Sequence, residues 1–267
     1  MSMIGFIGCG NMGGAIARAV CKAVRPEDVL LSNRTAAKAV ALAGELGCKV
    51  GSNEDAAECD WVFLAVKPQM MPEVLSGLCA QLAARKSRFV LVTMAAGLSM
   101  ARIRALAGGD YPVVRMMPNT PAAIGKGMIQ YCCADLTDVE KNTFASMLAP
   151  AGLLDELAEG QIDAASCVSG CGPAWAYQFI EALADGGVAA GLPRDKAIRY
   201  AAQMLAGSAE LVLQSGSHPG VLKDAVCSPG GSTIQGVRVL EQRAFRGAVT
   251  DAVLAAYDKT IAMGQTK

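Results

Sequence analysis

The sequence predicts an α/β fold with two domains, and two observations support this. Up to about residue 159, short apolar runs alternate with segments of helical periodicity, a pattern typical of a parallel sheet covered by helices. Beyond residue 160 the strand-like runs stop and long helical segments take over. We therefore expect an N-terminal α/β domain over residues 1–159 and an all-helical domain over residues 160–267.

A glycine-rich loop follows the first predicted strand, the apolar run Ile4–Ile7. Gly8, Gly10 and Gly13 have the spacing G-x-G-x-x-G, and helical periodicity follows from Ala15. The first glycine allows a tight turn, the second a close backbone approach to a pyrophosphate, and the third close packing of helix on strand. The pattern indicates a Rossmann dinucleotide-binding domain, since a helix N-terminus attracts phosphate. The alternative is a glycine-rich turn without a ligand.

The second predicted strand, Asp28–Ser32, is followed by Asn33, Arg34 and Thr35. An NAD-preferring site has an acidic residue about 20 positions past the glycines, to bind the ribose 2′-hydroxyl. Here a cation and hydrogen-bonding groups stand in its place, which favours a 2′-phosphate. We therefore expect NADP as the cofactor, with NADPH preferred and NADH possible. The alternative is a solvated loop with one surface arginine.

Further strands and helices alternate along the first domain. The expected strands are the apolar runs Lys49–Val50, Trp61–Val66, Phe89–Thr93, Val113–Met116, Ile129–Cys133 and Gly152–Leu157. Helical spacing predicts helices over Thr35–Leu46, ended by Gly47, over Glu54–Glu58, around Met70–Leu78, over Met100–Ala107, capped by Ser99, and over Leu136–Leu148.

Residues at the carboxyl ends of parallel strands line the ligand crevice of such a sheet. Ala65–Pro68 leave the strand at Trp61–Val66, and the small residues after Thr93 leave space for a ligand. The expected cofactor-binding residues are Ile7, Gly8, Cys9, Gly10, Asn11, Met12, Asn33, Arg34, Thr35, Asn53, Ala65, Val66, Lys67, Pro68, Met94, Ala95 and Ala96. In the loop Met117–Pro121, two prolines bracket Asn119, and this loop either faces a substrate or is an ordinary turn.

The C-terminal half is read as two long apolar helices. The first runs from Pro173 to Ala190 and is apolar nearly all round, so we expect it to be buried. Glu181 and Asp185 lie four residues apart on one face of this helix. They could act as an acid–base pair, but a polar stripe along a buried helix is the favoured interpretation. The second continues to about Gln214. Two such helices in a small domain indicate that a partner chain covers them, and we expect a homo-oligomer.

Composition excludes several classes of function. Lys and Arg together number 24, as do Asp and Glu, so nothing favours nucleic acid or a membrane surface as a partner. One histidine, His218, and no C-x-x-C spacing make a zinc site improbable. His218 stands in a turn and is the first candidate for a general acid, but a surface or capping role is favoured. The ten cysteines are typical of small buried side chains in a reducing cytosol. No segment predicts a bilayer span, and Met1–Met3 leave no room for a signal peptide, so we expect a cytoplasmic protein.

A second break, Ser228–Gly231, places Ser232 and Thr233 where another helix begins. A helix N-terminus entered through glycines and flanked by hydroxyls can hold an anion, here a substrate carboxylate. An ordinary capped helix start is the equal alternative.

With this stretch the chain resembles the Δ1-pyrroline-5-carboxylate reductases over its whole length. The resemblance rests on several motifs in order: G-F-I-G-x-G-N-M at Gly5–Met12, F-L-A-V-K-P at Phe63–Pro68, A-A-G at Ala95–Gly97, M-P-N-T-P at Met117–Pro121, S-G-x-G-P-A at Ser169–Ala174, A-L-A-D-G-G-V at Ala182–Val188 and L-K-D-x-V-x-S-P-G-G-x-T at Leu222–Thr233. Cys171 and Trp175 depart mildly from the family pattern.

The resemblance implies hydride transfer from NAD(P)H to C5 of a cyclic imine, yielding L-proline. It implies a helical domain that interlocks two chains, often in larger assemblies of dimers. It also implies that the Thr233 hydroxyl acts in catalysis by hydrogen-bonding the ring nitrogen. The substrate-binding residues it implies are Asn119, Ser228, Gly230, Gly231, Ser232 and Thr233.

Two other functions are compatible with a Rossmann domain followed by helices. A β-hydroxyacid dehydrogenase uses a lysine of its helical domain, but Lys196 and Lys223 stand in no matching motif. A nucleotide-sensing protein without turnover would not need the anion site at Ser228–Thr233.

Overall fold

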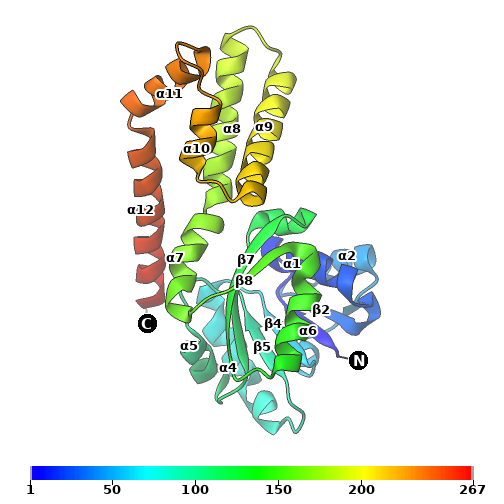
Figure 1. Cartoon of the computed structure of the whole chain (residues 1–267). Helices are drawn as coiled ribbons and strands as arrows, with labels where there is room; N and C mark the ends of the chain where they lie inside the picture. The colour runs from blue at the N-terminus through cyan, green and yellow to red at the C-terminus, as the bar shows by residue number, and fades with distance from the viewer. Residues whose placement is uncertain (1, 266–267) are drawn as a thin grey trace. The chain divides into compact units, whose positions relative to one another are not determined.

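The computed structural model describes residues 2–265 and contains an eight-stranded sheet (Figure 1). The sheet order is β3-β2-β1-β4-β5-β6-β7-β8, and only the β6–β7 pair is antiparallel. The strands are β1 (Ile4–Ile7), β2 (Val29–Ser32), β3 (Lys49–Val50), β4 (Trp61–Leu64), β5 (Val90–Thr93), β6 (Val113–Met117), β7 (Gly127–Ala134) and β8 (Gly152–Glu156). The reversal of strand order between β2, β1 and β4 is the position at which α/β sheets bind nucleotides.

Helices join these strands and continue after them. The α-helices are α1 (Asn11–Ala23), α2 (Ala36–Leu46), α3 (Asn53–Ala57), α4 (Met71–Ala84), α5 (Met100–Ala107), α6 (Asp138–Leu148), α7 (Glu159–Ser169), α8 (Gly172–Ala189), α9 (Arg194–Ser215), α10 (Pro219–Ala225), α11 (Ser232–Gln242) and α12 (Phe245–Gln265). No helix of the described chain is long and apolar enough to cross a bilayer.

The central strands β1, β4 and β5 are buried on both faces, as their continuous apolar runs require, while the edge strands β3 and β8 are largely exposed. Along β1 and β4, alternate side chains enter two separate cores. One core contains Phe6 and Phe63 with side chains of α1, α2 and α6, and the other contains Ile7 and Leu64 with side chains of α3, α4 and α5. The predicted alternation of strands and helices in the first domain is therefore confirmed.

Two predicted helix ends are confirmed at the residues expected. Ser99 caps α5 and accepts a hydrogen bond from the Arg102 backbone N–H at 3.1 Å, and Gly47 ends α2 in the left-handed conformation. The strand predicted over Trp61–Val66 is shorter and ends at Leu64, although the Ala65 N–H still donates to the Ile7 carbonyl oxygen at 2.9 Å.

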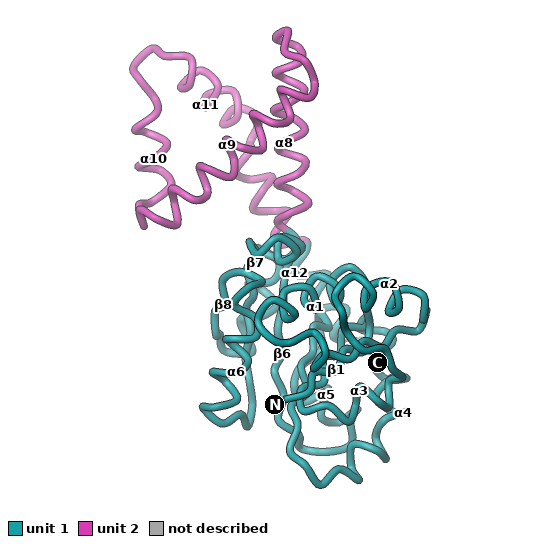
Figure 2. The backbone as a smooth tube through the Cα atoms, turned by 90° about the vertical axis from the view of Figure 1, so that its right-hand side faces the viewer, with its two compact units in different colours: residues 1–171, 256–267 teal, residues 172–255 magenta. Residues whose placement is uncertain are grey.

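The chain forms two compact units, coloured separately in Figure 2. Unit 1 comprises residues 1–171 and 256–267, and unit 2 comprises residues 172–255. Unit 1 thus holds the sheet, α7 and the end of α12. The domain boundary expected at 159/160 remains a prediction; the two compact units meet in sequence at 171/172 and at 255/256.

The expectation that the helix over Pro173–Ala190 is buried is wrong for the single chain. Tyr177 is 60% exposed and Leu183 is 38% exposed on α8. Within residues 172–255, the buried residues are only Ala184, Ala197 and Ala201, where α8 packs on α9. The sequence showed that this helix is apolar, but packing of α8 on α9 covers only one side of it and leaves its other apolar side chains exposed.

One charge cluster on unit 1 gives a pH prediction. Glu140, at the start of α6, accepts bonds from Arg88 at 2.7 and 3.0 Å and completes a capping box with Thr137. Hydrogen bonds from Arg88, and then from Thr137, lower the pKa of Glu140 to about 2. Because this folded-state pKa lies below the unfolded one, the contribution is complete above pH 4.5 and is lost as the pH falls toward 2.

We therefore expect Glu140→Gln to reduce the loss of stability between pH 4.5 and pH 2. Urea unfolding midpoints measured across this range check the prediction. Arg88→Gln should remove most of the same pH-dependent portion, because it removes the largest cause of the lowered pKa and leaves the bonds from Thr137. Equal acid slopes for wild type and Glu140→Gln would contradict the assignment.

Candidate functional site

The glycine loop between β1 and α1 has the geometry that its spacing predicts. Gly8 has φ +109°, a conformation that favours glycine, and a Cβ on it would lie 2.6 Å from the Ala65 carbonyl oxygen. A Cβ on Gly13 would lie 2.2 Å from the Gly8 carbonyl oxygen. At Gly10, by contrast, a Cβ would meet nothing within 4 Å. The loop is therefore closed where helix and strand meet and open at the position expected to approach a pyrophosphate.

The first turn of α1 is free to bind an anion. Gly10 is its N-cap and supplies no side-chain hydrogen bond, and the turn contains no acidic residue. Backbone N–H groups of a first turn have no partner within the helix, and the helix dipole places positive charge there. The Gly8 N–H, in the loop before this turn, is not available to an anion because it donates to the Ser32 carbonyl oxygen at 2.8 Å.

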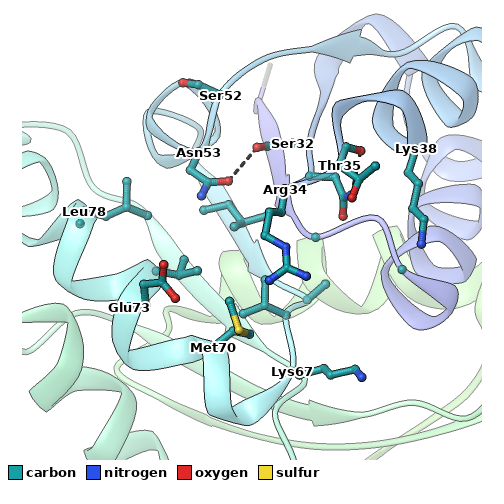
Figure 3. Close-up of a pocket in the computed structure, with 18 of the residues that line it drawn as sticks. Ser32, Arg34, Thr35, Lys38, Ser52, Asn53, Lys67, Met70, Glu73 and Leu78 are labelled. Carbon is teal, nitrogen blue, oxygen red and sulfur yellow. Dashed lines mark hydrogen bonds between the residues drawn. The ribbon is translucent and has the colours of Figure 1, made fainter.

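One polar contact holds the loop beside the end of β2, and a second joins β2 to the start of α3. The Cys9 N–H donates to Asn33 Oδ1 at 2.9 Å, and the Ser32 hydroxyl donates to Asn53 Oδ1 at 2.7 Å (Figure 3). The Asn33 amide nitrogen donates to the Thr35 carbonyl oxygen at 3.0 Å. Asn33, expected to bind the cofactor, is thus already bonded within the protein through both side-chain atoms, and it positions the loop.

A cavity of about 730 Å³ opens beside this loop, within the size range of ligand sites. Ten of the expected cofactor-binding residues line it: Ile7, Gly8, Gly10, Asn33, Arg34, Thr35, Asn53, Ala65, Val66 and Lys67. Ser32, at the end of β2, also lines it. The lining residues that were not predicted are Lys38, Gly51, Ser52, Glu54, Gln69, Met70, Glu73, Val74, Gly77 and Leu78. The cavity thus follows the carboxyl ends of β1, β2 and β4, as the topology requires.

Three cations from separate segments surround this cavity. Figure 3 shows Arg34, Lys38 and Lys67 around it, with Glu73 on α4. Across residues 2–265, none of the three cations takes part in an ion pair. The arrangement fits a dinucleotide bearing an additional phosphate, since an uncapped helix N-terminus and three free cations face the same space.

Lys38 is a cation that the sequence analysis missed. It stands four residues after Arg34 in the first turn of α2 and is exposed. Arg34 precedes the N-cap Thr35 and lies outside α2, so helical spacing does not relate the two residues and only their nearness in sequence hinted at Lys38.

The remaining expected cofactor residues lie outside the cavity lining. They are Cys9, Asn11, Met12, Pro68, Met94, Ala95 and Ala96. Ala95 is fully buried, and Cys9 is 9% exposed with its thiol directed to the Ser32 carbonyl oxygen at 3.4 Å. Asn11 and Met12 begin α1, so their backbone N–H groups belong to the free first turn.

Asn119 is a buried packing residue in this structure, at 7% exposure. Its amide nitrogen donates to the Ser169 carbonyl oxygen at 3.0 Å, and its amide oxygen accepts from the Met128 N–H at 2.9 Å. Through Asn119, the proline-bracketed loop is hydrogen-bonded both to β7 and to the end of α7.

A buried cation lies nearby in the sheet and was also missed. The Arg115 side chain, on β6, is 3% exposed and pairs with Asp163 of α7, and its Nη1 lies 3.8 Å from Glu159 Oε1. Glu159 also accepts a bond from the Met100 N–H at 2.6 Å. Because a charge inside an otherwise apolar strand needs a partner, this pair explains how Arg115 is tolerated.

The second predicted anion site lies in unit 2, at the start of α11. Gly231 is the N-cap and gives no side-chain bond, and its own N–H donates to the Ser228 carbonyl oxygen at 3.0 Å. Gly230 has φ +72°, which turns the chain into the helix. Ser228, Ser232 and Thr233 are exposed. The predicted helix start is confirmed, with a free first turn beside hydroxyl groups.

Other charged candidates of unit 2 have structural roles. His218 caps α10, where its Nδ1 accepts from the Gly220 N–H at 3.1 Å. Asp185 pairs with Arg194 at 2.5 Å between α8 and α9. The prediction of a capping histidine is therefore confirmed.

Comparison with protein families gives two matches. The model described as pyrroline-5-carboxylate reductase dimerisation matches residues 159–263. The model described as NADP oxidoreductase, coenzyme F420-dependent, matches residues 3–97. The helical half and the glycine-loop half thus match separate models.

Curated relatives extend this similarity over the whole chain. A pyrroline-5-carboxylate reductase of Escherichia coli is 39% identical, covering 96% of each chain. One of Glycine max is 41% identical, covering 95% of this chain and 93% of the relative.

Solved structures agree with the relatives. A Plasmodium falciparum pyrroline carboxylate reductase with NADP bound superposes with a TM-score of 0.89 at 32% identity, over 99% of this chain and 98% of the other. A 1-pyrroline-5-carboxylate reductase of Streptococcus pyogenes gives 0.88 at 30% identity, over 98% of each chain. An imine reductase from Pseudomonas, at 19% identity and a TM-score of 0.60, shares the fold.

Proposed function

Because the chain belongs to the pyrroline-5-carboxylate reductase family, we propose that it reduces Δ1-pyrroline-5-carboxylate to L-proline with NAD(P)H, the last step of proline biosynthesis. The observation that carries this proposal is the near-complete coverage of curated relatives bearing this name, at 39% identity for the Escherichia coli enzyme. The open glycine loop and the cation-lined cavity support a nicotinamide cofactor. Family membership argues against the β-hydroxyacid dehydrogenase and the non-catalytic nucleotide sensor.

The cofactor's phosphates have a proposed place in unit 1. The free N–H groups of the first turn of α1 hold the pyrophosphate, and Gly10 leaves room for its approach. Arg34 and Lys38 hold the 2′-phosphate, because both reach the cavity without a competing carboxylate partner. We therefore infer a preference for NADPH over NADH.

We expect Arg34→Ala to lower the kcat/KM for NADPH about 10-fold, with a much smaller effect for NADH, because one charge-assisted hydrogen bond to phosphate is lost. Steady-state kinetics with both cofactors check this. Lys22→Ala, on the last turn of α1 and away from the cavity, is the matched control for loss of a surface cation. Equal losses for both cofactors would contradict a role at the 2′-phosphate.

The substrate's carboxylate has a proposed place at the start of α11. Backbone N–H groups at Ser232 and Thr233, with the Ser228 hydroxyl, bind the carboxylate, supported by the positive end of the helix dipole. The Gly231 N–H contributes less, since it already bonds the Ser228 carbonyl oxygen. Asn119, which the resemblance also implies, has its amide bonded within unit 1, to the Ser169 carbonyl oxygen and the Met128 N–H.

The chemistry asks little of the protein beyond placement. The reduced nicotinamide supplies a hydride to ring carbon C5, which is already electrophilic when the ring nitrogen is protonated. The Thr233 hydroxyl hydrogen-bonds the ring nitrogen while it changes from imine to amine. Holding the acid group and the nitrogen at two points orients the ring, which is the main source of rate in such a reaction.

Assembly and location complete the proposal. The dimerisation model on residues 159–263 and the exposed apolar side chains of α8 and α9 support a homodimer. We infer a higher assembly of such dimers. Free thiols at all ten cysteines support a cytoplasmic location, because reducing compartments keep thiols reduced.

One assay tests the proposed reaction. Oxidation of NADPH by pyrroline-5-carboxylate should be fast and should yield proline, while a panel of β-hydroxyacids with NADP⁺ should give no turnover. Turnover of a hydroxyacid alone would favour the dehydrogenase. Cofactor binding without any turnover would favour the sensor.

A further inference from the structure

Two thiols lie against each other in unit 1, on residues that do not line the cofactor cavity. Cys21 lies in the last turn of α1, and Cys48 directly follows Gly47, the C-cap of α2. Their Sγ atoms are 3.3 Å apart and share a hydrogen bond, although 27 positions separate them in sequence. Both side chains are partly exposed, so a small reagent can reach them.

A disulfide between Cys21 and Cys48 requires only a small movement of their sulfur atoms. A disulfide needs its sulfur atoms about 2.05 Å apart, roughly 1.3 Å closer than here. Neither cysteine lies in the interior of an element: Cys21 is in the last turn of α1, which ends at Ala23, and Cys48 lies between α2 and β3. Helix ends and short connections adjust more readily than element interiors.

The two sulfurs differ in reactivity. The hydrogen bond from Cys21 lowers the pKa of the Cys48 thiol, while the same bond, with burial, raises the pKa of Cys21. A third thiol, Cys9, packs in the same core, but burial raises its pKa to about 11. The thiolate is the nucleophile in disulfide chemistry, so Cys48 is the attacking member of the pair.

We propose that Cys21 and Cys48 are a redox-active dithiol that low-molecular-weight disulfides, such as glutathione disulfide, convert to an intramolecular disulfide. The Cys48 thiolate attacks one sulfur of glutathione disulfide and releases one glutathione thiolate. Cys21 then loses its proton, attacks Cys48 Sγ and displaces the second glutathione. In sum, the protein gives up two protons and two electrons, and one glutathione disulfide takes them up to become two glutathione molecules.

The disulfide closes a loop that contains β2, Arg34 and Lys38. It joins the C-terminal ends of α1 and α2, which otherwise lie together through non-covalent contacts alone. Cross-linking residues so far apart restricts the unfolded chain, so the oxidised protein unfolds at a temperature higher by about 5 °C. The proposal rests on this geometry and not on the reaction that the protein catalyses.

Peptide mapping tests the bond directly. The full-length protein is incubated with glutathione disulfide, blocked with iodoacetamide and digested with trypsin. The expected product links residues 19–22 to residues 39–49, two tryptic peptides that contain no other cysteine. Dithiothreitol should separate them, and thermal unfolding should show the shift only in the oxidised sample.

Three serine variants give the controls. Cys21→Ser and Cys48→Ser should each abolish both the linked peptide and the temperature shift. Cys79→Ser, which removes another partly exposed thiol, should leave both unchanged. Glutathione attached to Cys48 without a link to Cys21 would overturn the proposal, as would an equal temperature shift in Cys48→Ser.

Discussion

Thr233→Ala is expected to lower kcat for pyrroline-5-carboxylate reduction about 100-fold. The hydroxyl is proposed to hydrogen-bond the ring nitrogen while its charge and protonation change, and groups that assist such proton movement contribute at least this factor. Thr233 is exposed at the second position of α11 and is not needed for packing. Turnover should therefore fall without loss of the fold.

Steady-state kinetics and thermal unfolding together check this prediction. Thr233→Ser keeps a hydroxyl and should recover most of the rate. Thr250→Ala is the matched control, because Thr250 is also an exposed helical threonine of unit 2, with its hydroxyl bonded to the Arg246 carbonyl oxygen at 3.0 Å. If Thr233→Ala turned over like wild type, Thr233 would have no part in the mechanism.

Asp163→Ala is expected to lower the free energy of unfolding by about 3 kcal/mol, at the lower end of the range for breaking a buried ion pair. The Arg115 side chain is 3% exposed and, among the residues that the structure describes, would keep only Glu159, at 3.8 Å, as an ion-pair partner. Its Nε already has no hydrogen-bond partner in the described structure. Asp163 keeps 19% exposure, which limits the cost.

Urea unfolding measures this effect as a lower midpoint at an unchanged slope. Adding Arg115→Met to Asp163→Ala should restore part of the stability, because the unpaired charge is then gone. Asp155→Ala removes an exposed carboxylate from β8 and should change the midpoint little. A midpoint in Asp163→Ala equal to that of Asp155→Ala would show that the pair does not stabilise the sheet.

The cofactor side of the site was largely predictable because its signals are local. The positions of Gly8, Gly10 and Gly13 dictate a turn and a close helix–strand contact within six residues of chain. The Ser99 cap and the Gly47 helix end likewise depend on neighbours only a few positions away. Ten of the expected cofactor residues line the cavity for the same reason: strand ends follow from strand patterns.

Side-chain partners could not be predicted in the same way. The Asn33 amide is used by Cys9, 24 positions away, and the Arg115 guanidinium by Asp163, 48 positions away. Which distant groups meet depends on how helices pack on the sheet, and no periodicity records it. The same limit hid the pairing of Cys21 with Cys48.

The sequence by itself determined the α/β order, the glycine loop, the helix ends and the family, because periodicity, backbone preference and motif order are properties of neighbouring residues. The tertiary structure alone decided that Lys38 faces the cavity and that α8 stays largely exposed in one chain. It also decided that Asn119 is buried and hydrogen-bonds two segments distant in sequence. Burial and pairing are set by what the packed chain brings together, and apolar character on a helix does not by itself supply the surface that covers it.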